Sequence, residues 1–539
     1  MAAAGLCDSF VDIAELPGFV ISSAGSIAAG ILLGKRKHDK ANCAFTLSFL
    51  LALLGGLLCC CLLPFCDIFG RLLTNNGTIA KDVAQYTFLT IAAAPFIGVN
   101  LIISSFAILD NHSKVAMAQV LATNATNLAL DYLFMGPMNM GVAGAAAATL
   151  VGTVVGILVG LRYLLSSKRT FRFIDIRGNL KETVKTIGSS SSSFAFDKGS
   201  RIVSGLIVNV VLVYFVGNMG VALYAIFGRL KFIIRILVGG ASKTISSLGS
   251  MLYGERDFYG IRKMMSIIFR YTYAVVFVVA VLLFLIPGQF LQFFGLDASA
   301  PHTHLISAFR LMLFSLPVFW MNDLLAIYYP CVQKQKLSVL LFALQNLVFK
   351  ILILLLCVAA TNWGLGQMPA VALWCLLVEV LSLTVTLLWE KVKYGRVSIF
   401  RAEDTGHQEC HFFSIAGQPE SVADIHQEIG RFCRENNIPP NKGNLLSIAF
   451  EEAALNIINH NDKVSSIDIC LLLEDGDLIV RIRDDGAPFD PLEYEDEQDI
   501  LYRNNIRLLE KIADKKGYTR IMNMNNTVLS IRLQEQGTI

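Results

Sequence analysis

The sequence predicts a multi-pass α-helical membrane protein followed by a soluble α+β domain. Of its 539 residues, 54% are hydrophobic and only 16% are charged, with a mean hydropathy of +0.57. A soluble protein of this size does not need so much apolar surface. Residues 1–400 contain 31 basic and 17 acidic residues (net +14), whereas residues 401–539 contain 14 and 25 (net −11). A basic, apolar body with an acidic tail indicates a membrane protein with a cytosolic domain.

Eleven apolar runs in the first part are long enough to cross a bilayer, which takes about 20 helical residues. They lie near 10–33, 42–69, 83–108, 114–135, 141–165, 190–217, 220–250, 265–294, 303–329, 337–360 and 367–389. Basic residues concentrate in alternate joints, such as 35–37 and 391–396, whereas the joints at 74–77 and 362–367 have none. The positive-inside rule therefore predicts that the basic joints and the tail are cytoplasmic and that the N-terminus is outside.

The membrane region contains an internal repeat, as many transporters do. Four pairs of identical residues are each separated by 222 positions: Pro95 and Pro317, Asn100 and Asn322, Lys114 and Lys336, and Asn124 and Asn346. Gly34 and Gly254, each before a basic loop, are separated by 220. The helix predicted at 190–217 then has no counterpart after Met1. We therefore expect two six-helix halves with the first helix missing, through either a start site assigned too late or a genuine eleven-helix variant.

These patterns divide the chain into five parts. We expect an N-terminal lobe at 1–165, a cytoplasmic inter-lobe linker at 166–189, a C-terminal lobe at 190–395, a second linker at 396–409 and a soluble domain at 410–539. Because the second linker is short, it keeps the soluble domain near the bilayer.

Three motifs in the membrane region point to a family. They are Gly34-Lys-Arg-Lys-His-Asp-Lys-Ala41, Asn127-Leu-Ala-Leu-Asp131-Tyr-Leu-Phe134 and Gly141-Val-Ala-Gly144-Ala-Ala-Ala-Ala-Thr149. With the two-times-six-helix arrangement, they resemble the MATE family, the multidrug and toxin extruders, over about residues 10–390. The resemblance implies export of small organic cationic or amphiphilic molecules through the lipid bilayer, coupled to Na⁺ or H⁺ by intramembrane carboxylates.

Acidic residues inside the predicted spans are candidate coupling sites, because ionisable groups in the membrane interior are costly. The ionisable candidates inside the spans are Asp197, Asp323, Lys350 and Glu379, of which the three acids are the candidate coupling residues. Lys198 and Arg201 lie close enough in sequence to neutralise Asp197 as a structural ion pair, which is an equally good interpretation. Glu379 also fits the interpretation of a satisfied packing carboxylate.

The soluble tail has the pattern of an α+β sandwich. Strands are predicted at 411–416, 465–473, 477–483, 516–522 and 527–533, the last two joined around Asn525-Asn526, with helices over 420–436, around Glu452 and near 503–514. Within the middle helix, Glu452, Asn456 and His460 are four residues apart and share one face. The stretch Asp484-Asp-Gly486-Ala-Pro488-Phe-Asp490-Pro491 follows an apolar strand, and its Gly and Pro residues predict a tight turn.

The two stretches together resemble the GHKL ATP-binding fold, and in particular its anti-sigma-factor serine kinase branch. The resemblance implies that Glu452 is a general base, that Asn456 holds Mg²⁺ between the phosphates, and that Asp484 accepts the adenine amino group above Gly486. His460 and Pro488 belong to the same motifs and are further candidates for nucleotide binding. An amide oxygen suits Mg²⁺, which prefers oxygen ligands.

One segment departs from that family. Relatives usually have a second glycine motif, G-x-G-L, that cradles phosphates, but this chain has Arg503-Asn504-Asn505-Ile506-Arg507-Leu508 there, after an acidic loop at 493–497. Asn505 can still form the turn, because asparagine tolerates positive φ better than most residues. We expect ATP binding weaker than in the kinases, and the sequence leaves open whether ATP is hydrolysed or transferred.

Three functions remain after these observations. The first is a cation-coupled exporter in a bacterial cell membrane whose ATP-binding tail regulates it or phosphorylates a serine of a small cytosolic protein. The second is a transporter-derived membrane receptor that switches the tail kinase, and the third is a degenerate transporter with a tail that only docks a partner. The transporter part is not expected to be an enzyme, and we expect no nucleic-acid partner.

Overall fold

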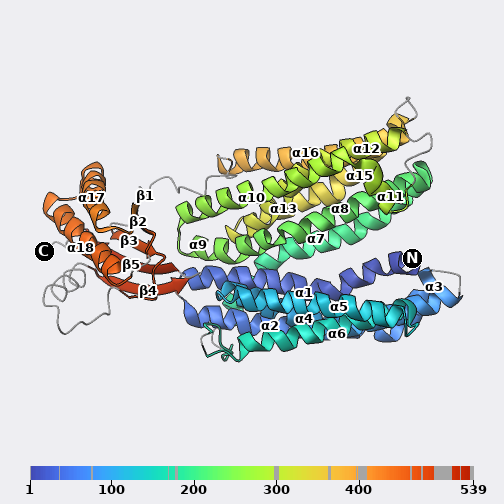
Figure 1. The fold of residues 1–539 in the computed structure, drawn as a ribbon, viewed down its shortest axis with the longest axis horizontal. Coiled ribbons are helices and arrows are strands. Elements are labelled where there is room, and N and C mark those ends of the chain that lie inside the picture. The colour runs from blue at the N-terminus through green and yellow to red at the C-terminus, as the bar shows by residue number, and fades with distance from the viewer. Residues whose placement is uncertain are drawn as a thin grey trace. The chain divides into compact units, whose positions relative to one another are not determined.

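A computed structural model of the chain contains two compact units, Met1–Ala402 and Glu403–Ile539, shown in Figure 1. The residues that it describes are 2–35, 37–73, 77–167, 169–176, 180–296, 303–361, 366–395, 397, 410–461, 464–474, 477–490, 513–521 and 524–533. The boundary between the units falls inside the predicted linker 396–409.

The first unit is almost entirely helical and consists of two lobes. The first lobe contains α1 (Ala2–Gly34), α2 (His38–Cys60), α3 (Cys66–Leu73), α4 (Gly77–Leu109), α5 (Ser113–Met135) and α6 (Gly141–Leu164). The second lobe contains α7 (Leu180–Phe215), α8 (Gly217–Thr244), α9 (Ser250–Gly254), α10 (Phe258–Leu285), α11 (Pro287–Phe293), α12 (Thr303–Leu313), α13 (Ser315–Cys331), α14 (Gln335–Ala343), α15 (Phe349–Thr361) and α16 (Gln367–Tyr394). Helix α1 packs against α2 and α4 of its own lobe and against α7 and α9 of the other (Figure 1).

Nine helical segments within the described residues are long and apolar enough to cross a membrane. The predicted spans at 114–135 and 220–250 are also helical, as α5 and α8 with its continuation, but they are too polar to belong to the nine. Helix α8 is polar because it carries basic residues at Arg229, Lys231, Arg235 and Lys243.

The span predicted at 42–69 is not one helix. α2 ends at Cys60, and a short 3₁₀ turn at Leu63–Phe65 separates it from α3. Pro64 explains the break, because proline lacks a backbone N–H group and clashes with the preceding helical turn.

The backbone confirms the internal repeat. The N–H group of His112 donates to the carbonyl of Ala107 at 2.7 Å, and the matching bond from Lys334 to Tyr329 is 2.8 Å long. The residue before each donor has positive φ, 59° at Asn111 and 58° at Gln333, and these two are again 222 residues apart. The two helices therefore end in the same left-handed C-terminal cap.

Gly34 and Gly254 make the corresponding contact between the lobes. A Cβ atom added to Gly34 would collide with the carbonyl of Met251, and one added to Gly254 would collide with the carbonyl of Ile31. The predicted glycine pair thus allows the ends of α1 and α9 to approach closely, because each glycine lies against the backbone of the other helix.

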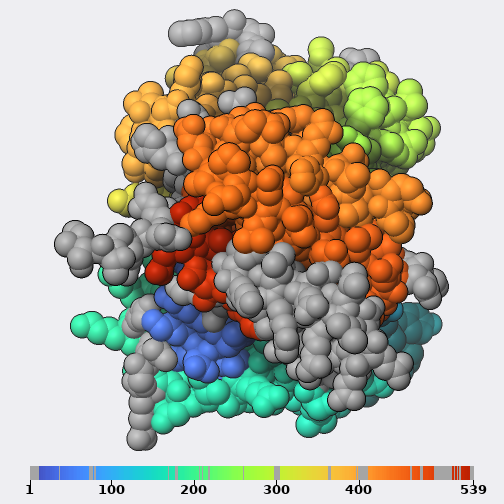
Figure 2. Space-filling view, turned by 90° about the vertical axis from the view of Figure 1, so that its left-hand side faces the viewer, coloured from blue at the N-terminus to red at the C-terminus, as the bar shows by residue number. Residues whose placement is uncertain are grey.

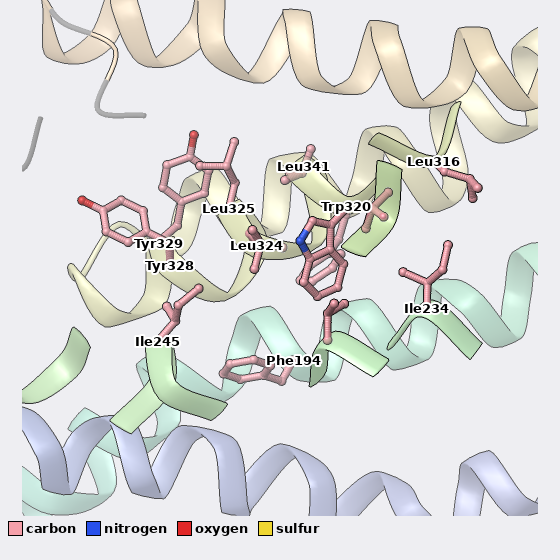
Figure 3. Packing of buried hydrophobic residues seen from close by; sticks show 14 of the residues in the cluster. Phe194, Ile234, Ile245, Leu316, Trp320, Leu324, Leu325, Tyr328, Tyr329 and Leu341 are labelled. Atoms are coloured by element: carbon pink, nitrogen blue, oxygen red, sulfur yellow. The ribbon is translucent and has the colours of Figure 1, made fainter. Parts of the chain in front are cut away.

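The core of the second lobe is built from large side chains on helices that are distant in sequence. Figure 3 shows Trp320 and Leu324 of α13 among Phe194 of α7, Ile234 of α8 and Leu341 of α14. Trp320 has no exposed surface. Close packing of this kind holds helices together in a bilayer, where lipid supplies no hydrophobic drive for helix association. It fixes α7, α8 and α13 as neighbours.

Two π-helical turns interrupt long helices of the second lobe. Ile245–Gly249 joins α8 to α9, and Leu344–Val348 joins α14 to α15. Such turns insert an extra residue into a helix and are frequent at functional sites.

The second unit is an antiparallel sheet covered by two helices, which confirms the predicted α+β sandwich. The elements are β1 (Cys410–Ala416), a short 3₁₀ turn (Pro419–Val422), α17 (Ala423–Glu435), α18 (Pro440–Asn459), β2 (Ser466–Glu474), β3 (Asp477–Asp484), β4 (Lys515–Ile521) and β5 (Met524–Arg532). The strand order is β1-β2-β3-β5-β4. The helix predicted near 503–514 lies, apart from its last two residues, outside the described residues.

The two helices bury one face of this sheet. Ile425 and Phe432 of α17 and Phe450 of α18 pack on Ile469 and Val480 of the strands. Figure 2 shows the opposite, outer surface of α17 and α18 in orange. Because side chains alternate along a strand, every second residue of β3 faces the helices, and the last of these is Asp484.

Candidate functional site

The first candidate site lies where α18 and β3 end side by side. Asn456 is 5% exposed and belongs to the buried stripe of α18 with Ala453 and Ile457, which faces the sheet. Glu452 is one turn earlier and half-buried. The predicted Glu452 and Asn456 therefore do lie on one face of the helix.

The sequence predicted His460 on the same helix, but α18 ends at Asn459, and His460 is the residue after it. Its backbone N–H group donates to the carbonyl of Asn456 at 3.1 Å, which completes the final turn. Its ring stacks on Phe489, with 4.7 Å between centroids and 11° between planes. This stack connects the end of α18 to the loop after β3.

Asp484 is the most enclosed acid of the site, with 2% of its surface exposed. Its Oδ1 atom accepts hydrogen bonds from the Asn525 side chain at 2.7 Å and from the Gly486 backbone at 3.0 Å. Burial raises the pKa of the Asp484 carboxyl above its ordinary value, and these two hydrogen bonds act in the opposite direction. The carboxylate is thus held by neutral donors on one oxygen.

Asn525 organises this side of the site and was not predicted as a site residue. The sequence analysis placed Asn525-Asn526 in a turn, but β5 begins at Met524, and Asn525 pairs with Asp484 across the sheet. The Asn525 Oδ1 atom accepts from Tyr518 and from Arg520, both at 2.7 Å. A turn would leave its amide in solvent, whereas in the strand the amide bonds to four groups.

The loop after β3 is held from two directions. The N–H group of Ala487 donates to Asn461 Oδ1 at 2.7 Å, and Arg520 donates to the Gly486 carbonyl at 3.0 Å. A Cβ atom on Gly486 would lie 2.8 Å from Asn461 and 2.9 Å from Asp484, so only glycine fits without displacing either side chain. Pro488 is exposed in the same loop.

The described residues fit the nucleotide that the resemblance implies. The Asn456 Nδ2 atom is buried without a hydrogen-bond partner, and within the described part of the chain no bond to Asp484 Oδ2 is found. The unsatisfied Nδ2 atom is a hydrogen-bond donor that suits a phosphate oxygen, the oxygen of the same amide is the atom that would ligate Mg²⁺, and the Asp484 carboxylate could accept from the adenine amino group. The predicted Asn505 and the acidic loop at 493–497 lie outside the described residues.

The second candidate site is a cavity of about 320 Å³ in the second lobe. Four of its lining residues are basic, one is acidic and four are aromatic: Arg201, Lys231, Arg235, Lys350, Glu379, Tyr224, Phe232, Phe319 and Trp374. These side chains come from α7, α8, α13, α15 and α16.

Each of the three predicted coupling acids forms an ion pair at this cavity. Asp323 accepts two bonds from Arg235, at 2.5 and 3.2 Å. Asp197 is 2.8 Å from the Arg201 guanidinium. Glu379 lines the cavity, and one of its oxygens is 2.6 Å from Lys231.

Two of these carboxylates also accept hydrogen bonds from neutral side chains. The second oxygen of Glu379 accepts from Asn322 at 2.9 Å and from Gln345 at 2.7 Å. Asn346 donates to Asp197 at 3.0 Å. Gln345 and Asn346 both belong to the π-helical turn Leu344–Val348.

Of the two basic neighbours suggested for Asp197, only Arg201 pairs with it. Lys198 instead contacts Asp12 of α1 at 2.7 Å and Glu15 at 3.5 Å. One residue apart on a helix is about 100° of rotation, so Lys198 points to a different neighbour. Among the residues with a described structure, no group of three or more His, Cys, Asp or Glu side chains could hold a metal ion.

Lys231 and Arg235 were missed by the sequence analysis. Their partners are 148 and 88 residues away, so no local pattern connects them. One available signal was their spacing of four within the predicted span 220–250, which places two cations on one face of the helix.

Comparisons with known proteins find matches to two families, one at each end of the chain. Residues 1–133 match the MatE family, and residues 415–528 match the histidine kinase-like ATPase domain. The multidrug export protein MepA of Staphylococcus haemolyticus is 24% identical over 224 residues, which are 40% of this chain and 48% of that protein. MepA of Staphylococcus aureus gives the same identity and coverage. The chain thus spans about half the length of the curated relatives that it matches.

Solved structures share the fold of the membrane region. The structure of MATE in complex with MaL6 has a TM-score of 0.66 and 21% identity, covering 73% of this chain and 88% of that one. A MOP superfamily transporter from Pyrococcus furiosus, described as having a binding pocket of reverse polarity, has a TM-score of 0.64 and 22% identity, covering 74% and 89%.

Proposed function

We propose that this chain, which joins a MATE transporter region to a histidine kinase-like ATPase domain, moves small organic molecules across a bacterial cell membrane under control of the ATPase domain. The observation that carries the transport proposal is the charged cavity in the second lobe. Charged groups inside a membrane bundle are costly and are retained where they contact a substrate or an ion. The cavity is bounded by helices from both ends of the second lobe, so a change in their packing changes access to it.

Coupling to Na⁺ or H⁺ belongs to this proposal. A proton or sodium ion would have to compete with Arg235 for Asp323, with Arg201 for Asp197, or with Lys231 for Glu379. Glu379 is best placed, because it lines the cavity itself and is 3% exposed. Opening its pair with Lys231 would change the charge that the cavity presents to a substrate.

The C-terminal domain is proposed to bind Mg-ATP in the cytosol. Asn456 would contribute its oxygen to Mg²⁺, and Asp484 would accept a hydrogen bond from the adenine amino group. When bound, ATP would supply a phosphoryl group, and Mg²⁺ would neutralise part of the negative charge of the phosphates. Glu452 would orient a nucleophile such as the hydroxyl of a small regulatory protein.

Transport can be tested with inside-out vesicles that contain the full chain. We expect accumulation of labelled benzoate or tetraphenylphosphonium that depends on a Na⁺ or H⁺ gradient and changes when Mg-ATP is added. Vesicles prepared without the protein provide the background accumulation. Equal accumulation in both preparations, for both probes and gradients, would contradict the transport proposal.

A receptor function is the second candidate, and the ion pairs favour it. All three candidate coupling acids are neutralised by basic side chains, an arrangement that can sense a ligand without releasing an ion. In that case ligand would alter ATP binding by the tail while no probe accumulates. Measuring nucleotide binding with and without each probe separates the two functions.

A further inference from the structure

We infer that the second-lobe cavity binds a small organic anion with an aromatic or apolar body, held by Lys350 and the basic side chains around it. This inference rests on the proposed function, because it names the substrate class of the same cavity. It differs from the cationic or amphiphilic cargo that the family resemblance implies.

The charges around the cavity do not cancel. Arg201, Lys231, Arg235 and Lys350 are the four cations that line it, against the three carboxylates Asp197, Asp323 and Glu379. Each carboxylate is paired with one of the first three cations. One positive charge is left over, and it is on Lys350.

Lys350 has a weak partner in the described part of the chain. Its ammonium group donates to the hydroxyl of Ser204 at 3.2 Å, and no ion pair to it is found there. An ammonium group without a counter-charge is costly in a low-dielectric interior. A ligand carboxylate, sulfonate or phosphate would supply that charge, and Arg201 and Lys231 line the same cavity.

An organic cation would meet the opposite situation. It would approach an uncompensated ammonium group, and it would have to displace Lys231 from Glu379 to find a free carboxylate. Lys231 is also held by the ring of Phe319, 4.6 Å from its centroid, which lowers its tendency to leave. The cavity therefore discriminates by charge.

The walls suggest the rest of the ligand. Tyr224 and Trp374 have ring centroids 5.0 Å apart and line the cavity together with Phe319. A volume of about 320 Å³ is at the small end of ligand pockets, roughly 300–1,000 Å³. A single aromatic ring with one acidic group fits this space and these surfaces.

The test compares two probes of nearly equal size and opposite charge, benzoate and benzylammonium. Binding of each labelled probe to the purified full chain in detergent is measured by scintillation proximity. We expect saturable benzoate binding that excess benzylammonium does not displace. Preferential binding of benzylammonium, or no binding of benzoate, would overturn the inference, and this result needs no variant.

Lys350→Met tests the proposed anchor. We expect benzoate affinity to fall about 10- to 100-fold, the effect of losing a charge-assisted hydrogen bond, and Lys350→Arg to retain most of it. Lys243→Met is the matched control, because Lys243 also donates to a serine, Ser105, at 3.2 Å, but does not line the cavity. It should change affinity less than about twofold. Equal affinity in the Lys350→Met and Lys243→Met variants would also overturn the inference.

The vesicle assay keeps this inference separate from transport. Gradient-driven accumulation of tetraphenylphosphonium without benzoate binding would overturn the anion site and leave the transport proposal standing. Saturable benzoate binding that is lost in Lys350→Met, without accumulation of any probe, would support the anion site and favour the receptor function instead.

Discussion

Two carboxylates, the half-buried Asp323 in the membrane region and the buried Asp484 in the C-terminal domain, are stabilised in opposite ways. Asp323 has both oxygens bound by the guanidinium of Arg235. Asp484 has one oxygen bound by the neutral donors of Asn525 and Gly486. The first carboxylate has its charge and its accepting capacity consumed by the protein. The second has neutral hydrogen-bond donors, and among the described residues no bond to its other oxygen is found, so that oxygen can accept from a ligand.

The difference shows that burial of an acid does not by itself identify a binding residue. What matters is whether the partner brings an opposite charge. By this criterion Asp484 is the stronger ligand-binding candidate, and Lys350 is the most available of the charged groups that line the second-lobe cavity.

The largest effect should come from breaking the Asp323 pair. Arg235→Met leaves a carboxylate without a counter-charge inside a membrane bundle, which we expect to cost about 3 kcal/mol of stability. The measurement is thermal unfolding of the purified chain in detergent. The double variant Arg235→Met/Asp323→Leu should recover most of the loss, because leucine stands at the matching position 101 of the first lobe. An equal loss of thermal stability in the single and double variants would show that the unpaired Asp323 carboxylate does not cause the loss.

The second effect concerns ligand binding at Asp484. Asp484→Asn keeps the acceptor for Asn525 and Gly486 but loses the negative charge, so Mg-ATP should bind about 10- to 100-fold more weakly to the full chain. Isothermal titration calorimetry measures this directly. Asp485→Asn is the control, because Asp485 is exposed and bonds to Ser465. The comparison fails if both variants bind Mg-ATP equally well.

A smaller effect is expected at Asn525. Asn525→Ala removes the donor to Asp484 and to the Ala487 carbonyl, which should destabilise β3 and β5 by about 1 to 2 kcal/mol. Hydrogen exchange of the amides in these strands reports the local stability. Asn441→Ala, at an exposed position of α18, should have no such effect. Unchanged protection in Asn525→Ala would mean that the amide does not position the carboxylate.

The smallest effect is a pH dependence. Because burial raises the pKa of Asp484, the folded domain binds the proton more tightly than the unfolded chain does. The protonated carboxyl therefore favours folding at low pH, and this contribution is lost as the pH rises through the folded-state pKa. Exchange protection of β3 in the wild type relative to Asp484→Asn should increase as the pH is lowered from 7 toward 4. An opposite trend would show that the hydrogen bonds outweigh burial.

The membrane fold was largely predictable, because apolar runs and the 222-residue repeat are properties of the sequence itself. The residues at which the helices begin and end were less predictable. An apolar run marks the part of a helix that is immersed in lipid, and α7 begins at Leu180, ten residues before the predicted 190–217, because a helix continues beyond the bilayer. The break at Pro64 is visible in the sequence but was overridden by the apolar residues around it.

The site was predictable where its residues are close in sequence. Asn456 and Asp484 follow from local motifs, and the structure brings them to the same end of the sandwich. Asn525 and Arg235 do not follow from local motifs. The role of Asn525 depends on strand register across 41 positions, and that of Arg235 on helix packing across 88 positions. The coupling roles of Asp197, Asp323 and Glu379 stay predictions.

The π-helical turn Leu344–Val348 sets the rotational phase of the helix that follows it. Such a turn adds about one residue to an α-helix, and one residue corresponds to about 100° around the helix axis. The direction of Lys350, two residues after the turn, depends on this offset. Deleting one residue from the turn would swing its ammonium group out of the cavity without changing any charged side chain. The net charge that the cavity presents to a ligand thus depends on helix geometry as well as on residue identity.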